Sequence, residues 1–149
     1  MKSTIQFRGR VVTEKLKRSS SKALAYGLSY AKGYAVKRVS SPNYTTVMSH
    51  NAGKLVEHSK PGRFPHKGSG ALESAIGFEI MPYDPRGFIR GRFGLREGHN
   101  AVRGGFDYAL HLEKGGRFVK KRPFLVPSIR NNKARIRSLI TSRLKALLR

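Results

Sequence analysis

The sequence predicts an α+β fold in which a small antiparallel sheet packs against a long N-terminal helix and a long C-terminal helix. Three observations support this prediction. Apolar and small residues recur at steps of three and four over residues 11–38 and again over residues 129–147, which is typical of helices. Between these two stretches, residues 75–81 and 88–95 have strand character and are joined by turn residues, so they indicate a hairpin.

The N-terminal part is expected to hold a short strand followed by the first long helix. Residues 3–7, STIQF, form the possible strand. The helix is predicted over residues 11–38 because one stripe recurs at helical spacing, made of Val12, Leu16, Ser19, Ala23, Gly27, Ala31 and Tyr34. Small residues in this stripe let another helix or a sheet approach closely. Pro42 ends the helix, since the residue before a proline is pushed out of the α region.

The middle of the chain has a weak pattern until residue 70. Residues 59–70, SKPGRFPHKGSG, contain two prolines and three glycines and predict a long loop. The strand at 75–81 follows, with Ile76, Phe78 and Ile80 on one face. In the second strand, 88–95, the apolar residues do not alternate strictly, so we expect a bulge near Gly91.

The last third is expected to contain a short helix or strand over residues 106–113, a Gly115-Gly116 break and the long C-terminal helix. Pro123 is predicted in the first turn of that helix, where its missing N–H has little effect. The buried stripe of the helix comprises Ile129, Asn132, Ile136, Leu139, Ile140, Leu144 and Leu147. Residues 1–149 therefore predict a single domain that carries a long Pro/Gly loop around residues 59–70.

The charge of the chain is its most unusual property. It has 31 Lys and Arg against 8 Asp and Glu, a formal net charge of +23, and no carboxylate follows Glu113 although twelve Lys and Arg do. Such an excess destabilises a compact monomer through self-repulsion, so it indicates a polyanionic partner, with nucleic acid first among the candidates. The chain has no cysteine, no run of apolar residues long enough to span a membrane and no signal-like N-terminus. We therefore expect a soluble protein made inside a cell.

The basic residues gather in three stretches, which are residues 8–22, 86–96 and 117–122. No motif of a sequence-reading nucleic-acid module is present, so we expect salt-sensitive attraction to phosphate backbone. Loops and strand edges are where side chains reach a partner. The expected contact residues are Arg86, Arg90, Arg92, Lys120, Lys121 and Arg122. A solvated basic face without a specific ligand is the alternative reading of the same charge.

Catalytic and metal-binding patterns are weak. His58 and His66 are eight residues apart across the Pro/Gly loop, a poor match to metal-ligand spacing. The few carboxylates, such as Glu73 and Glu79, have many cations available as ion-pair partners, which favours structural roles over acid–base catalysis. The serines lack a nucleophile elbow, and no phosphate-binding glycine loop precedes a helix. The sequence therefore predicts a protein that is not an enzyme and that needs no cofactor or metal.

Two segments together resemble a known family. One is SKPGRFPHKGSGALESAIGFEI, residues 59–80, and the other combines Tyr-Ala-x-x-x-Glu-x-Gly at 108–115 with Arg-Pro-Phe-Leu-x-Pro at 122–127. In order and spacing they are similar to the neck or tail-completion proteins of long-tailed bacteriophages, also described as minor tail or head–tail joining proteins. The resemblance covers about residues 55–148. The sequence departs from the family pattern at Ala75 and at Gly116.

The resemblance implies a structural protein of the virion neck, made in the host cytoplasm, that forms a ring of identical subunits between head and tail. A hexamer is typical, DNA passes through the ring, and the neighbours are head-completion or connector proteins on one side and tail-terminator or tail-tube proteins on the other. Glu113 would cap a helix or form an ion pair, and Pro123 and Pro127 would set where the chain enters the last helix. The loop expected to reach a neighbouring subunit or ring carries Gly62, Arg63, Phe64, Pro65 and Gly70.

Two rival functions are compatible with the composition. A ribosomal or other protein that binds RNA backbone explains the size, the charge and the absence of cysteine equally well, but it does not require the two proline motifs. A basic nuclease would need carboxylates or histidines around a metal, and the sequence assembles no such group.

Overall fold

The computed structural model describes residues 3–8, 14–40, 46–51, 54–59, 61–63, 65, 70–84, 86, 88–98, 102–103, 106–117 and 120–148. The helices are α1 (Glu14–Ser40), α2 (Ala71–Ala75), α3 (Tyr108–Lys114), α4 (Leu125–Arg130) and α5 (Lys133–Leu148). The strands are β1 (Ser3–Arg8), β2 (Thr46–Asn51), β3 (Lys54–Ser59), β4 (Ile76–Ile80), β5 (Phe88–Leu95), β6 (Val102–Arg103) and β7 (Phe106–Asp107).

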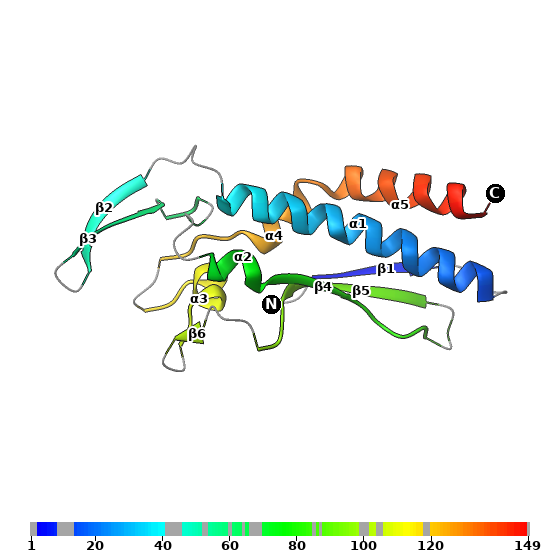
Figure 1. Ribbon diagram of the computed structural model, residues 1–149, viewed down its shortest axis with the longest axis horizontal. Helices are drawn as coiled ribbons and strands as arrows, with labels where there is room; N and C mark the ends of the chain where they lie inside the picture. Colours follow the sequence, from blue (N-terminus) through cyan, green and yellow to red (C-terminus); the bar gives the residue numbers. More distant parts are fainter. Residues whose placement is uncertain are drawn as a thin grey trace.

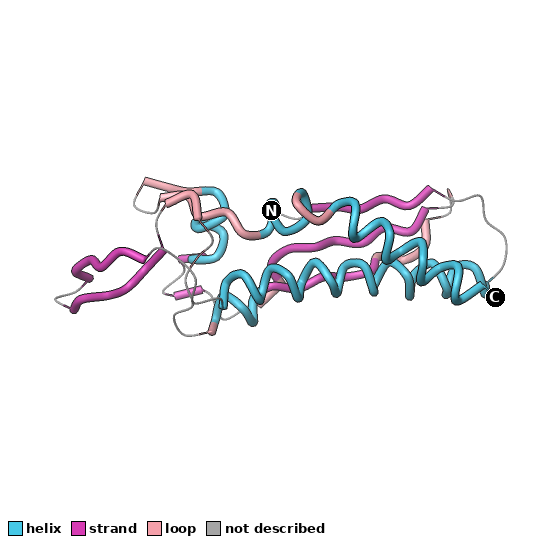
Figure 2. Tube along the Cα trace, turned by 90° about the horizontal axis from the view of Figure 1, so that it is seen from above, coloured by secondary structure: helices cyan, strands magenta, loops and turns pink. Residues whose placement is uncertain are grey.

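The long helix α1 lies in the middle of the molecule. Figure 1 shows α5 along one side of it and the sheet of β1, β5 and β4 along the other, and both neighbours contact α1. The view from above in Figure 2 shows that the two long helices and the strands of the sheet run along the same long direction. This arrangement confirms the predicted α+β fold, with a long helix near each end of the chain.

The three-stranded sheet has the order β1-β5-β4, and both pairings are antiparallel. The predicted N-terminal strand and the predicted hairpin are therefore present. Strand β5 matches the expected residues 88–95, and β4 falls within the expected 75–81. The strand register is unbroken on both sides of Gly91, which is opposite Ile5 in β1 and opposite Ile80 in β4. The predicted bulge near Gly91 was wrong.

Helix α1 packs directly on Gly91, so this position has no room for a side chain. A Cβ atom added at this position would overlap the Leu28 side chain and come within 3.3 Å of Leu24 Cδ2. Along β5 the residues buried toward the helix alternate strictly, with Ile89, Gly91 and Phe93 all buried. The glycine that suggested an irregular strand therefore serves the contact between the helix and a regular sheet.

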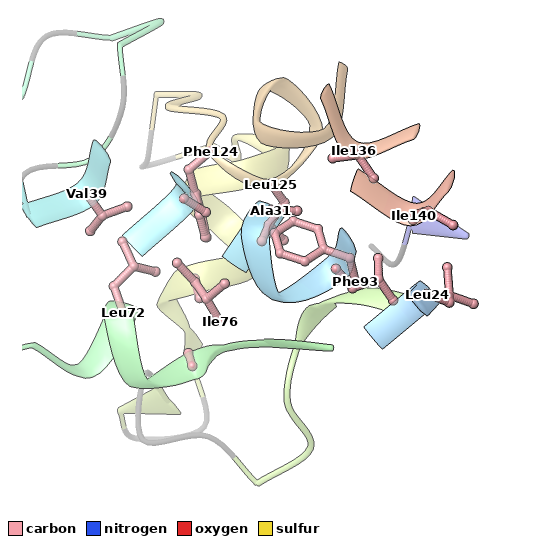
Figure 3. Packing of buried hydrophobic residues seen from close by; sticks show 14 of the residues in the cluster. Leu24, Ala31, Val39, Leu72, Ile76, Phe93, Phe124, Leu125, Ile136 and Ile140 are labelled. Atoms are coloured by element: carbon pink, nitrogen blue, oxygen red, sulfur yellow. The ribbon is translucent and has the colours of Figure 1, made fainter. Parts of the chain in front are cut away.

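The other side of α1 packs against α5 through the small residue Gly27. A Cβ atom at Gly27 would come within 2.5 Å of Ile140 Cγ1 and 3.3 Å of Ile136 Cγ2. Figure 3 shows these two isoleucines beside the core residues of α1, with Phe93 of the sheet close by. Since α1 is covered on two sides, small residues fill its stripe, as the sequence predicts.

Three local features differ from the sequence-based predictions. The stretch with a weak pattern contains an antiparallel hairpin, β2–β3, which extends beyond the end of α1 in Figure 1. A short helix, α2, precedes β4. The predicted C-terminal helix is two helices, α4 and α5, separated by Asn131 and Asn132, and Pro123 precedes α4 instead of lying in its first turn. Helix α1 begins within its predicted range, whose residues 11–13 lie outside the described part of the chain.

Candidate polyanion-contact surface

The surface is built around a buried carboxylate. Glu113 of α3 is 2% exposed. Its Oε2 accepts hydrogen bonds from the backbone N–H groups of Phe124, at 2.7 Å, and Leu125, at 2.9 Å, and its Oε1 accepts one from Val126 at 3.0 Å. These N–H groups lie at the N-terminal end of α4. The first N–H groups of a helix have no hydrogen-bond acceptor within the helix itself. Glu113 therefore caps α4 from a different helix, and its negative charge meets the positive end of the helix dipole.

The capping interaction holds the basic connector 120–122 against the rest of the molecule. The backbone N–H of Arg122 donates to the Leu112 carbonyl of α3 at 2.7 Å. The backbone N–H of Gly62 donates to the Lys121 carbonyl at 2.8 Å. Two groups of residues that were predicted separately, the connector and the Pro/Gly loop, are thus joined through the backbone.

Gly115 makes the turn that returns the chain toward this connector. Its φ of 80° and ψ of 170° lie in a region that side chains exclude, and a Cβ atom there would be 3.3 Å from Lys121 Cβ. Tyr108, at the opposite end of α3, is 44% exposed. Burial of the rest of its ring raises the pKa of Tyr108, and the positive charge of Arg122 partly opposes this increase.

Four exposed cations gather on these three segments, and we call them the basic cluster. They are Arg63, Lys114, Lys120 and Lys121. Within the part of the chain that the structure describes, none of the four side chains has a carboxylate within ion-pair distance. Arg117 and Arg122 lie on the same segments and make contacts of their own. Because Glu113 is used by α4, the cluster keeps its positive charge for a partner.

The arginines of the β4–β5 hairpin, which the sequence assigned to the same role, are in a different situation. Arg90 Nη2 is 3.2 Å from Asp84 Oδ2, and Arg92 Nη1 is 3.4 Å from Glu79 Oε1. Arg86 is exposed, and its backbone N–H donates to Asp84 Oδ1 at 2.8 Å. Among the described residues, Lys120 and Lys121 of the connector therefore have no carboxylate partner, whereas Arg90 and Arg92 of the hairpin are partly neutralised.

The residues expected in an interface loop are also divided. Gly62 and Arg63 are exposed, whereas Pro65 is fully buried, so its ring anchors the loop to the body of the protein. Gly70, with φ of 80°, precedes α2. Phe64 lies outside the described residues. The sequence-based selection missed Lys114, although its position between Glu113 and the Gly115 turn was a usable signal.

A metal site, a ligand pocket and a membrane-spanning helix are the other functional features to consider among the described residues. The described residues contain no group of three or more His, Cys, Asp or Glu side chains placed to hold a metal ion. A shallow groove of about 170 Å³ lies on β4 and β5, lined by Glu79, Arg92, Arg96 and Glu97 around two glycines. Ligand pockets are commonly about 300–1,000 Å³, so this groove is small for a cofactor. Among the described helices, none has the length and apolar character needed to cross a bilayer.

Comparisons of this chain with protein-family models, with curated proteins and with solved structures found no match.

Proposed function

We propose that this chain is a structural subunit of the neck of a long-tailed bacteriophage, where identical copies form a ring that joins head to tail and lets DNA pass. The observation that carries the proposal is the contact of Glu113 with the start of α4. It links the two halves of the second segment of the resemblance, Tyr-Ala-x-x-x-Glu-x-Gly and Arg-Pro-Phe-Leu-x-Pro, and explains why a glutamate and a proline-rich entry occur together. The role of this glutamate is architectural, as the proposal requires.

Assembly into a ring is supported by the hairpin β2–β3. In Figure 1 it extends away from the layers formed by α1, α5 and the sheet. A two-stranded hairpin is marginally stable in water by itself, so a neighbouring subunit is a suitable cover for it. A ring of identical subunits needs two different surfaces on each copy, and a hairpin at one end of an elongated subunit provides one of them.

The basic cluster gives the proposed subunit a second contact. Copies with a formal charge of +23 repel one another, and the repulsion grows as a ring closes. Acidic surfaces of the adjacent head or tail proteins, or DNA in the channel, would offset it. In this proposal the cluster of Arg63, Lys114, Lys120 and Lys121, together with the loop at residues 61–63, meets the neighbouring ring, and neither a cofactor nor catalysis is involved.

The proposal is tested on phage particles and on the isolated chain. We expect mass spectrometry of purified virions to detect the chain, labelled antibody to bind at the neck, and negative-stain images of the isolated chain to contain rings. We also expect binding to the head or tail partners to weaken steeply as salt concentration rises. Absence of the chain from purified particles would overturn the proposal, and salt-insensitive assembly would overturn the role of the basic cluster.

Binding to RNA backbone is the second candidate, and one observation favours it. Helix α5 has no acidic residue and exposes five Lys and Arg side chains, which suits a phosphate backbone of either nucleic acid. The two functions differ in where the protein is found in an infected or expressing cell. Sedimentation with ribosomes in place of particles would favour the RNA-binding function.

A further inference from the structure

Helix α5 has a charge distribution that the packing of the protein does not require. Its buried residues, Ile136 and Ile140, contact α1. Leu139, Leu144 and Leu147 are partly buried, and the other residues of the helix are exposed and include no carboxylate. The exposed cations are Lys133, Arg135, Arg137, Arg143 and Lys145.

The side of α5 opposite α1 is lined by small and hydroxyl-bearing residues. At 100° per residue, Ala134, Ser138 and Thr141 share with Lys145 the face that points away from Ile136 and Ile140, and all four are exposed. Arg137 lies on one flank of this strip and Arg135 on the other. A flat partner can therefore approach the helix closely while cations meet it from both sides.

The basic surface continues from α5 onto α1. The guanidinium carbon of Arg143 lies 5.7 Å from the ring centroid of Tyr26, which is 51% exposed. Lys22 lies one turn before Tyr26 on the same face of α1 and is also exposed. Arg143 contacts the Tyr26 ring at the seam between the helices, on the flank of α5 that also carries Arg135, so the basic surface reaches α1 on this flank. We call this surface the basic helical face. It comprises the exposed residues Lys133, Ala134, Arg135, Arg137, Ser138, Thr141, Arg143 and Lys145 of α5 with Lys22 and Tyr26 of α1.

We propose that the basic helical face binds the phosphate backbone of double-stranded DNA without reading its sequence. Lys and Arg side chains and Ser and Thr hydroxyls supply most contacts to phosphate in protein–DNA complexes, and this face combines them. Tyr26 and Leu148 are the large apolar residues that are markedly exposed on the described parts of α1 and α5. Protein partners usually bury an apolar and aromatic centre that is depleted in lysine, so a hydrated polyanion fits this face better.

This inference rests on the proposed function and deepens it, because it states which face of the subunit meets the DNA. The basic cluster lies on α3 and its neighbouring loops, toward the hairpin end of the molecule in Figure 1, whereas α5 lies along the opposite half. In this proposal the basic cluster and the basic helical face therefore contact different partners. One contacts an adjacent ring and the other contacts the DNA that passes through.

The test measures the affinity of the full chain for a short fluorescent DNA duplex across a series of KCl concentrations. The variant is Arg137→Gln with Lys145→Gln. Its matched control, Lys32→Gln with Arg96→Gln, removes the same charge from outside the basic helical face. Each phosphate contact contributes about 0.9 to the slope of log K against log salt, so the face variant should lose about 2 units of slope. The control should keep its slope within about 1 unit.

Three results would overturn the inference. Equal losses in both variants would mean that net charge alone attracts DNA. An unchanged slope in the face variant, with circular dichroism showing a folded protein, would place the contact elsewhere. Weaker binding of the face variant to polyglutamate but not to DNA would assign the face to an acidic protein. Because this test uses purified protein and DNA, its failure leaves the neck function to be judged by the particle experiments.

Discussion

Leu28 of α1 occupies the space that a side chain at Gly91 of β5 would need. The absence of a side chain at Gly91 therefore leaves room for Leu28 between the helix and the central strand. Gly27, the residue before Leu28, allows an equally close approach of Ile140 from α5 on the other side. Two neighbouring positions of one helix thus set the spacing of all three layers, and the basic helical face depends on that spacing.

We expect Gly91→Ala to destabilise the protein by about 1–3 kcal/mol, since the added methyl group overlaps a packed core side chain. Thermal or urea unfolding measures this change. The control is Gly33→Ala, in the same α1 helix, where a Cβ atom would meet nothing within 4 Å. That substitution should stabilise the helix by about 0.5–1 kcal/mol. A neutral Gly91→Ala variant would show that the helix does not pack on the sheet in this way.

Glu113→Ala should reduce the free energy of unfolding by at least about 3 kcal/mol, because three backbone N–H groups lose a charged acceptor. Glu113→Gln should be intermediate. Its oxygen can keep the bonds from Phe124 and Leu125, but its amide group then faces the N–H of Val126. Urea unfolding at neutral pH distinguishes these variants. Glu79→Gln, which breaks an exposed ion pair with Arg92, serves as control and should cost less than about 1 kcal/mol.

The attachment of α5 can be tested at Ile136, which is 2% exposed. We expect Ile136→Ala to cost about 2–4 kcal/mol, since a buried side chain is lost from the contact with α1. Hydrogen exchange should increase first in α5, because the sheet side of α1 is left intact. Leu148→Ala, at a position that is 44% exposed, should change stability by less than about 0.5 kcal/mol. Uniform loss of protection across the molecule would contradict a separate α5 layer.

Gly115→Ala should lower the melting temperature more than Gly98→Ala does. Both glycines have positive φ, but a Cβ atom at Gly98 meets nothing within 4 Å, whereas one at Gly115 would contact Lys121. Backbone strain of this kind costs about 1–3 kcal/mol. The Gly115 variant should also displace the connector and weaken salt-sensitive contact by the basic cluster. Equal melting temperatures for the two variants would argue against the packed turn.

The elements that the sequence predicted well are those whose pattern is local. The helical stripe of α1 and the flanks of the β4–β5 hairpin can be read within a window of some ten residues. In β2 and β3 the apolar residues are adjacent, as in Val47-Met48 and Leu55-Val56, so the alternation of a half-buried strand is hidden. This hairpin was missed for that reason.

The candidate surface was harder to predict, because its features depend on contacts between distant residues. Arg92 is opposite Glu79 through strand pairing, which the composition of β5 does not reveal. Gly91 suggested a bulge because Leu28, its true neighbour, is in a different element. The connector residues Lys120 and Lys121 are exposed, while the link of Lys121 to Gly62 depends on how the chain folds back at Gly115.

The central position of α1 has a consequence for how the chain folds during synthesis. The hydrogen bond from Tyr30 to Asn132, 3.5 Å long, joins residues 102 positions apart, and the elements β4, β5 and α5 that contact the helix are all translated after it. Folds rich in such distant contacts form slowly. We therefore expect the nascent helix to leave the ribosome uncovered and to stay accessible to chaperones until α5 has been synthesised.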